Sequence, residues 1–453
     1  MRVSSLFSLS AILIAAASAS FIAPTTLDQE VVTQHRTEPP FIVEVVANGV
    51  PKDGKPYTPD PDQHLQLVGL DLWIGASAAY EDIKESQKGT ESDLPFQLKG
   101  QNDTDDVEVA AGIAKSIQDD PRVLAVVGHG ITQTTQTAAP FYSAARIPLV
   151  LALATADNAI RSNVTQKRLG IGFRLSPSDN KVQAPAIAYF ITTHIYPNAA
   201  HSTTVHLYKS SADKAMSYSG PLCEETSAIL SAEGINNHVF PVDTIQKAVE
   251  HVLTHPFQDF IVYCGYPTEA VQFVTALQEV YSKANAPKPP RFIFSDAAPE
   301  GFAKAADAIS AYRTAALDTS RCTDQKTLEK LRTKANEVKR PLTDEQIHGY
   351  DAIEVLEAAA LKCKNRLSRS CILQQLESGE TFPSVCSSYS FRNGENIISD
   401  YFIFPEGNSK DEGNGGRLQP AVHSDAITLT APEILRMLMI KERAVGTTAQ
   451  ANK

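Results

Sequence analysis

Long apolar segments and basic surfaces are scarce in this chain of 453 residues. After the first twenty residues, no apolar run approaches the roughly 20 residues that a transmembrane helix needs. The net charge is −11, and no basic stripe is interleaved with aromatic residues, whereas a phosphate-binding surface must be cationic. We therefore expect a protein that is not embedded in a membrane and has no nucleic-acid partner.

Motifs for catalysis, metal binding and nucleotide binding are also lacking. The chain has no GxSxG nucleophile elbow and no CxxC pair. His251 and His255 stand four residues apart, but Val252 replaces the glutamate of a zinc-protease helix, which favours two solvated histidines. The segment Gly49–Lys55 has P-loop spacing, yet Pro56 replaces the hydroxyl residue that would hold magnesium. We expect no enzyme, no metal and no cofactor.

The first residues that are present in a recognisable pattern form a secretory signal. Arg2 supplies a short basic region, Leu6–Ala17 an apolar core, and Ala17-Ser-Ala19 a small-residue cleavage site. We expect residues 1–19 to be a signal peptide that is cleaved near Ala19, and residues 20–40 to be a polar leader. With 43% hydrophobic and 21% charged residues, the remainder has the composition of a globular protein of two or three domains.

The six cysteines agree with export to an oxidising compartment. Their even number permits three disulfides among 15 possible pairings. Four of them fall between residues 322 and 386. At least one bridge is therefore expected in that region, and Cys363–Cys371 is the candidate.

Strand-like and helix-like segments alternate twice along the chain, which is typical of parallel sheets with helical crossovers. The first run contains strands at Phe41–Ala47, Phe96–Lys99, Val123–Val127 and Ile147–Leu153, with helices at Leu67–Glu85, Val107–Gln118 and Thr134–Ala145. The second run contains helices at Ala184–Thr193, Gly220–Glu233 and Thr268–Ala284, with strands at Thr203–Tyr208, His238–Pro241, Phe260–Cys264 and Arg291–Phe294. Two such runs predict two α/β lobes.

Hydroxyl side chains follow two neighbouring strands of the first run. Thr132 comes after the strand Val123–Val127, and Thr155 comes after the strand Ile147–Leu153. In a parallel sheet these two strand ends lie side by side, next to the first backbone N–H groups of the helix Thr134–Ala145. This arrangement predicts a site that holds a small anion such as a carboxylate.

The same stretch resembles the bacterial branched-chain amino-acid-binding proteins, which are type I periplasmic binding proteins of ABC transporters. The resemblance rests on Val-Val-Gly128-His129, Thr132 and Leu153-Ala-Thr155, which align as one block without a gap. Further matches follow in the same order at Phe173-Arg174 and in the ranges 259–266, 292–296 and 350–360. Together they cover roughly residues 40 to 405.

The resemblance implies two doubly wound parallel-sheet lobes joined by a three-segment hinge. The chain would cross between lobes near residues 178, 318 and 390. The corresponding parts are residues 41–178 plus 319–390 for lobe 1, 179–318 plus 391–405 for lobe 2, and 406–453 for a C-terminal extension with a short helix at Pro432–Lys441.

The resemblance also implies a set of ligand contacts. Thr132 and Thr155 would bind a carboxylate, and Asp296 would hold an ammonium group, although Asp296 also suits the role of a helix N-cap. Tyr266 would contact the ligand, with lobe packing as the alternative, and Tyr57 would cover it from a loop bordering the cleft. Two of these positions depart from the family: Leu153 stands where the family has a small residue, which narrows the floor of the pocket, and Asp296 stands where the family has Glu. A second aromatic contact is implied after the strand Thr203–Tyr208, where Tyr218 is the nearest candidate.

These features predict an exported, periplasmic solute-binding protein that captures a small amino acid or related compound by cleft closure and delivers it to an ABC permease. A second hypothesis is a sensory or regulatory module that acts on a partner protein after binding its ligand. A third is an enzyme on this scaffold, or a lobe pair that binds nothing. Because the pocket floor and the acidic residue both differ from the family, the ligand itself is left open.

Overall fold

The computed structural model describes the following residues: 41–52, 64–87, 96–162, 165–196, 204–211, 213–255, 260–282, 290–295, 311–363, 367–386, 388–396, 401–406, 427–430 and 432–441. They belong to one compact unit, Pro39–Lys453. The predicted signal peptide and leader, Tyr57 and Asp296 lie outside these residues.

The first sheet is built around five parallel strands in the order β2-β1-β3-β4-β5. Their bounds are Ile42–Val46 for β1, Gln97–Gln101 for β2, Val123–Gly128 for β3, Leu149–Leu151 for β4 and Gly172–Arg174 for β5. Every residue of β1, β3 and β4 is buried, because helices cover both faces of such a sheet. Three short strands extend it beyond β5, namely β13 (Glu395–Asn396), β12 (Ser388–Arg392) and β11 (Thr381–Pro383).

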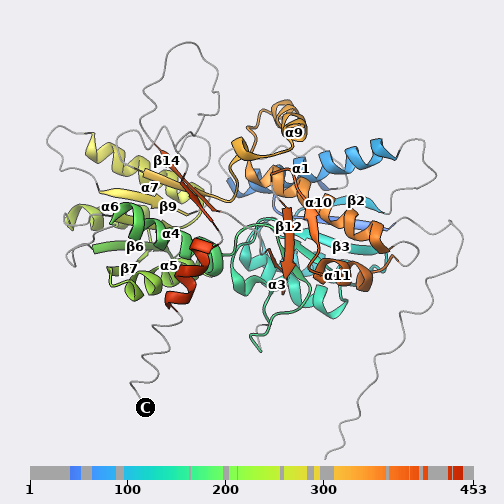
Figure 1. Cartoon of the computed structure of the whole chain (residues 1–453), viewed down its shortest axis with the longest axis horizontal. Helices are drawn as coiled ribbons and strands as arrows, with labels where there is room; N and C mark the ends of the chain where they lie inside the picture. The colour runs from blue at the N-terminus through green and yellow to red at the C-terminus, as the bar shows by residue number, and fades with distance from the viewer. Residues whose placement is uncertain are drawn as a thin grey trace, which may run out of the picture. The chain divides into compact units, whose positions relative to one another are not determined.

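The helices around this sheet come from two distant parts of the sequence (Figure 1). They are α1 (His64–Ser86), α2 (Val107–Asp119), α3 (Thr132–Ala144), α9 (Gln325–Glu337), α10 (Asp344–Cys363) and α11 (Arg369–Glu377). Helices α1 and α10 pack closely at Gly75 and Gly349. A Cβ on Gly75 would stand 1.8 Å from the Gln346 carbonyl oxygen, so only glycine fits there.

The second sheet repeats the same parallel order as β7-β6-β8-β9-β10. Its strands are β6 (Thr204–Ser210), β7 (Asn236–Val242), β8 (Phe260–Cys264), β9 (Arg291–Phe294), β10 (Ala311–Ala315), β14 (Tyr401–Glu406) and β15 (Ile427–Leu429), the last two being antiparallel. Helices α4 (Ala184–Phe190), α5 (Asp213–Ala232), α6 (Ile245–Thr254) and α7 (Pro267–Tyr281) accompany it. Two doubly wound sheets of equal order confirm the predicted fold class.

The third crossing between sheets occurs later than the sequence predicts. The prediction placed it near residue 390, with residues 391–405 in lobe 2. In the structure, β12 and β13 form a hairpin, with Phe391 opposite Asn396, and Glu395 pairs with Arg174 of β5. Residues up to 396 therefore belong to the first sheet, because the hairpin completes its edge.

The described part of the C-terminal extension packs onto the second sheet. Strand β15 pairs with β14, and a helix over 432–441 follows, at the position predicted from the sequence. Leu429, Ile434 and Met437 are buried in the same core cluster as β6 and β8. In Figure 1 this helix, drawn in red, lies beside α5, and Lys441 pairs with Glu225 of that helix at 2.5 Å. Residues 427–441 thus complete the second layer rather than standing apart from it.

Two helices begin earlier than predicted. Helix α3 starts at Thr132 instead of Thr134, because Ile131 is already extended and accepts hydrogen bonds from the Thr134 and Thr135 hydroxyls. Helix α10 starts at Asp344, six residues before the predicted match at Tyr350. Both starts matter for the site described below.

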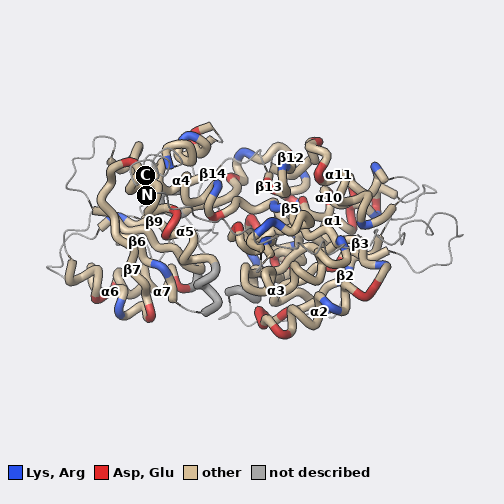
Figure 2. Tube along the Cα trace, turned by 90° about the horizontal axis from the view of Figure 1, so that it is seen from below, with Lys and Arg blue, Asp and Glu red and all other residues tan. Residues whose placement is uncertain are grey.

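Three disulfides link the six cysteines: Cys223–Cys264, Cys322–Cys386 and Cys363–Cys371. The third is the predicted pair. It joins the end of α10 to the first turn of α11, while Cys223–Cys264 joins α5 to β8. In the described part of the chain, no helix is long and apolar enough to cross a membrane. Acidic and basic residues are interspersed along the described trace (Figure 2).

Candidate ligand-binding site

A cavity of about 110 Å³ lies where the carboxyl ends of the parallel strands meet. Segments that follow β3, β4, β5, β8 and β10 all contribute to its wall. This is the edge at which doubly wound sheets bind ligands. A water molecule needs about 10–15 Å³ on the same measure, so the cavity has room for a small molecule.

Thr132 and Thr155, predicted to lie side by side, both line this cavity. Thr132 is the first residue of α3, and Ile131 before it provides no side-chain cap. The hydroxyls of Thr134 and Thr135 are directed back to the Ile131 carbonyl oxygen, at 3.1 and 2.8 Å. The uncapped first turn carries a partial positive charge, so this end of the cavity suits an anion.

The loop that carries Thr155 is held by a buried arginine. Arg174 is fully buried and donates to the carbonyl oxygens of Ala154 and Ala156, the latter at 3.0 Å. The Thr155 carbonyl accepts the Asp179 N–H at 3.1 Å. These bonds hold the backbone on both sides of Thr155.

His129, in the glycine turn after β3, serves the structure of the turn. It is completely buried, with Nδ1 2.7 Å from Asp103 Oδ2 and Nε2 3.0 Å from the Tyr142 hydroxyl. Burial raises the pKa of Tyr142 well above its usual value, so the phenol stays protonated. These contacts anchor the turn between β3 and α3.

Tyr266 forms the opposite wall together with Tyr218. The two rings are stacked, with centroids 5.8 Å apart and an angle of 18° between their planes. The Tyr218 hydroxyl donates to Gln183 Oε1 at 3.4 Å, and Gln183 also lines the cavity. Leu153, which the sequence predicts at the pocket floor, lies in the wall between Ala152 and Ala154.

The start of α10 adds three residues that sequence reasoning missed, namely Asp344, Glu345 and His348. Burial lowers the pKa of His348 to about 4, so this imidazole is neutral at pH 7. Asp344 Oδ2 accepts the Leu317 N–H at 3.2 Å. A signal for this helix start was present in the sequence, since Thr343-x-x-Gln346 has capping-box spacing, and the Thr343 hydroxyl oxygen accepts the Gln346 N–H at 3.4 Å.

The histidine pair on α6 lies away from this cavity. His251 and His255 are stacked with ring centroids 4.0 Å apart, and His251 Nδ1 lies 2.7 Å from the Tyr208 hydroxyl. Burial, with a smaller effect of His255, lowers the pKa of His251. Within the described residues, no group of three or more His, Cys, Asp or Glu side chains is placed to hold a metal ion.

Residues 65–410 match the family model for periplasmic binding proteins. The chain belongs to this family. The family predicted from the sequence is thereby confirmed, and it is a family of binding proteins. A search among curated protein sequences finds no match.

Solved structures of substrate-binding and solute-binding proteins share the fold. The branched-chain amino acid substrate-binding protein LivJ from Streptococcus pneumoniae, in complex with isoleucine, is 16% identical with a TM-score of 0.64, covering 86% of this chain and all of that one (100%). An ABC transporter substrate-binding protein from Desulfitobacterium hafniense, in complex with Leu, is 16% identical with a TM-score of 0.61, covering 82% and 98%. A solute-binding protein from Rhodopseudomonas palustris, in complex with 3,4-dihydroxybenzoic acid, is 11% identical with a TM-score of 0.62, covering 81% and 92%.

Proposed function

We propose that this periplasmic binding protein captures a small amino acid or a related carboxylate and delivers it to an ABC importer. The observation that carries the proposal is the anion end of the cavity, where Thr132 and Thr155 lie beside the uncapped start of α3. Two hydroxyls and a helix N-terminus bind a carboxylate without reacting with it. Closure of the two lobes around the ligand would produce the form that the permease recognises.

Each predicted residue has a role in this proposal. Thr132 and Thr155 bind the carboxylate, and Leu153 sets the length of the floor. Tyr266 packs against the ligand's side chain. Asp296 holds the ammonium group and Tyr57 covers the ligand, two roles that fall on residues outside the described part of the chain.

The ligands in the solved relatives support a carboxylate as the common group. Isoleucine, Leu and 3,4-dihydroxybenzoic acid differ in size and polarity, yet each carries a carboxylate. A carboxylate common to ligands that otherwise differ is the pattern expected of an anion site with variable walls. Here the wall is aromatic on one side and aliphatic at Leu153, which suits an apolar side chain.

The N-terminal sequence supports export to the periplasm, with cleavage near Ala19. Delivery to a permease is preferred over a sensory role, because the solved relatives include substrate-binding proteins of ABC transporters. Uptake of a radiolabelled ligand in cells with and without this protein separates the two roles. A sensory module would leave uptake unchanged.

A thermal-shift screen tests the proposal directly. The panel contains leucine, isoleucine, other amino acids and their amides, and benzoate. A ligand at about 100 times its dissociation constant adds roughly 2.7 kcal/mol to the free energy of unfolding, which raises the melting temperature clearly. We expect amino acids to shift the midpoint and their amides to fail, because the amide removes the carboxylate. No shift with any compound would contradict the proposal.

A further inference from the structure

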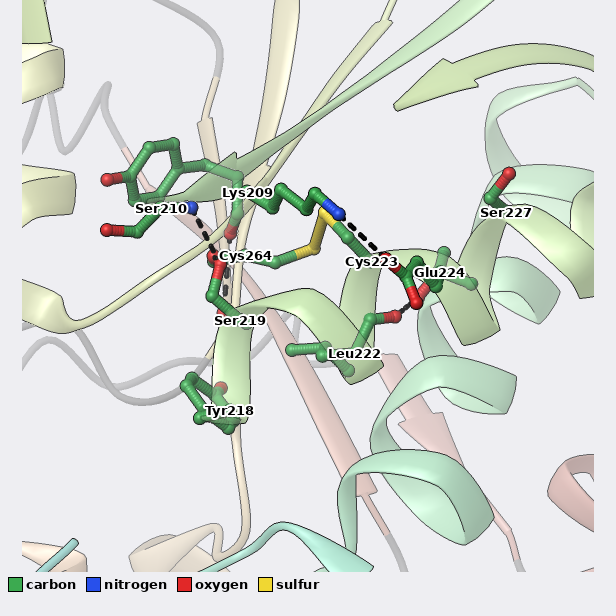
Figure 3. The surroundings of a disulfide bond; sticks show 12 residues. Lys209, Ser210, Tyr218, Ser219, Leu222, Cys223, Glu224, Ser227 and Cys264 are labelled. Atoms are coloured by element: carbon green, nitrogen blue, oxygen red, sulfur yellow. Dashed lines mark hydrogen bonds and ion pairs between the residues drawn. A yellow bond between two sulfur atoms is a disulfide. The ribbon is translucent and has the colours of Figure 1, made fainter. Parts of the chain in front are cut away.

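The disulfide Cys223–Cys264 joins the two segments that supply the aromatic wall of the cavity. Cys223 follows Tyr218 by five residues in α5, and Cys264 precedes Tyr266 by two residues at the end of β8. One covalent bond therefore joins the two segments that carry the stacked tyrosines. Figure 3 shows this bond beside Tyr218 and Ser219.

Hydrogen bonds around the disulfide link the same segments. The Ser219 hydroxyl donates to the Cys264 carbonyl and accepts the Ser210 N–H at 2.8 Å (Figure 3). Ser219 is itself fully buried and adjacent to Tyr218. Lys209 pairs with Glu224, next to Cys223, at 2.7 Å. The disulfide, these hydrogen bonds and this ion pair therefore connect the end of β6, the middle of α5 and the end of β8 to one another.

The backbone of Tyr266 is fixed from the other side by Glu269. One oxygen of this carboxylate accepts the Tyr266 N–H and the Tyr263 hydroxyl, both at 3.3 Å, and the other accepts the Ser210 hydroxyl at 2.8 Å. Ser210 therefore takes part in both sets of contacts. These contacts connect the backbone segments that carry the two tyrosines.

Both cysteines of this bond are completely buried. A buried disulfide is shielded from attack by a thiolate, since exchange requires access to a sulfur atom. The bond is therefore a permanent connection in the folded protein rather than a redox switch.

We propose that the Cys223–Cys264 disulfide positions Tyr218 and Tyr266 as a preformed wall against which the ligand's side chain packs. This inference rests on the proposed function, because it assigns the disulfide to the same cavity. A wall that is ordered before binding loses less conformational freedom when the ligand arrives, which strengthens binding without adding a contact. Without the bond, the start of α5 and the segment after β8 must be ordered by the ligand.

The test compares two double variants, C223A/C264A and C322A/C386A. The second removes the disulfide between residues 322 and 386, which lies in the first sheet's layer and whose cysteines are outside the cavity wall. Binding of isoleucine and leucine is measured by calorimetry at a temperature at which both variants are folded. We expect C223A/C264A to bind about tenfold more weakly than the wild type, and the control to change by less than about threefold. Equal affinities for C223A/C264A and the wild type would overturn the inference.

A cycle with Y218A and Y266A separates positioning from general destabilisation. If the disulfide acts through the tyrosines, its removal costs no further affinity in the Y218A/Y266A background, because coupled residues are non-additive. An undiminished loss in that background would overturn the inference.

Hydrogen exchange provides a readout that needs no ligand. We expect faster exchange in residues 213–222 and 265–270 of C223A/C264A, with the control unchanged in these segments. Unchanged exchange would contradict the positioning role. If the wild type binds neither isoleucine, leucine nor any other compound of the thermal-shift panel, the proposed function fails, while the exchange experiment still decides on the disulfide.

Discussion

Thr155 lines the cavity, and hydrogen bonds hold the backbone at Thr155 and at Ala156. A substitution of this side chain therefore tests its hydroxyl without disturbing the backbone. Thr155→Val keeps the shape and removes the hydroxyl. We predict a loss of about 1–3 kcal/mol in the affinity for the carboxylate ligand, measured by calorimetry. Thr137→Val is the matched control, because the Thr137 hydroxyl bonds to the Gln133 carbonyl within α3, and the residue is not part of the cavity wall. Equal affinities for Thr155→Val and the wild type would remove Thr155 from the site.

Asp296 can be tested by a substitution that separates its two possible roles. Asn retains the ability to cap a helix but lacks the charge. If Asp296 holds the ammonium group, Asp296→Asn weakens amino-acid binding by several kcal/mol, since a desolvated cation loses its partner. A dissociation constant equal to that of the wild type would show that Asp296 does not hold the ammonium group.

Asp351 gives the free energy of unfolding a defined dependence on pH. Burial raises the pKa of this carboxyl from 3.8 to about 7, although the Val385 N–H and the Tyr389 hydroxyl, each 2.9 Å away, lower it. Between pH 4 and 7 the folded state therefore binds a proton that the unfolded state has released.

This difference stabilises the folded state below about pH 4, and the stabilisation is lost as the pH rises to 7. The slope is up to about 1.4 kcal/mol per pH unit. We predict that Asp351→Asn removes this contribution and makes the free energy of unfolding less dependent on pH, although Asp179 and Glu354, whose pKa values burial also raises to about 7, still contribute. Urea denaturation of both proteins from pH 4.5 to 7.5 measures it, and parallel curves would show that the carboxyl is ionised throughout.

At the scale of single elements, the helix starts depend on local capping, and α2 is the clearest case. Asp106 accepts the backbone N–H groups of Glu108 and Val109 at 2.8 and 3.0 Å. We predict that Asp106→Ala lowers the free energy of unfolding by about 1 kcal/mol, while Asp106→Asn changes it little, because Asn caps nearly as well. Denaturation curves measure both. An equal loss for the two variants would mean that the charge, and not the cap, matters.

The start of α3, in contrast to that of α2, has no side-chain cap. Ile131 provides no side-chain cap, and two threonine hydroxyls nearby turn back to its carbonyl oxygen. A helix that lacks a side-chain cap is less stable by about 1 kcal/mol. Functional sites often depart from the most stable local arrangement in this way. The same N–H groups that a cap would occupy are left for an anion.

At the scale of the whole molecule, ion pairs connect two of the segments by which the chain passes between the two sheets. Glu395 lies 3.1 Å from Arg174 Nε, 2.7 Å from Arg168 Nη1 and 3.7 Å from Lys181 Nζ. Burial acts to raise the pKa of Glu395, but the three cations lower it below its ordinary range. Arg174 ends the last parallel strand before the first crossing, and Glu395 lies in β13 before the third, so this group fixes two of the three crossings to each other.

We predict that Glu395→Gln lowers the free energy of unfolding by about 3 kcal/mol, because it leaves the buried Arg174 without its counter-charge. The contribution of Glu395 is present above pH 4.5 and is lost as the pH falls through its lowered pKa. Urea denaturation at pH 7 measures the loss. As a control, Asp243→Asn removes a pair with Lys247 in which both side chains are more than 60% exposed, and should lower the free energy of unfolding far less, because solvent screens the pair. Similar losses for the two variants would contradict the argument.

The sequence by itself determined the features that depend on local order along the chain. Strand and helix periodicity predicted the two α/β runs, and the hydroxyls at two strand ends predicted that Thr132 and Thr155 meet at one place. The short spacing of Cys363 and Cys371 predicted their bond. These inferences succeed because backbone hydrogen bonds and side-chain alternation act over a few residues.

Only the tertiary structure decided the features that depend on contacts between distant segments. The hairpin of β12 and β13 stays with the first sheet because Glu395 pairs with Arg174, 221 residues earlier. The start of α10 reaches the cavity because Gly75 and Gly349 let α1 and α10 approach closely. Tyr218 joins Tyr266 through a bond between cysteines 41 residues apart. Many pairings between distant segments are compatible with the sequence, and close packing in the folded protein determines which of them forms. A local sequence pattern contains no information about that packing.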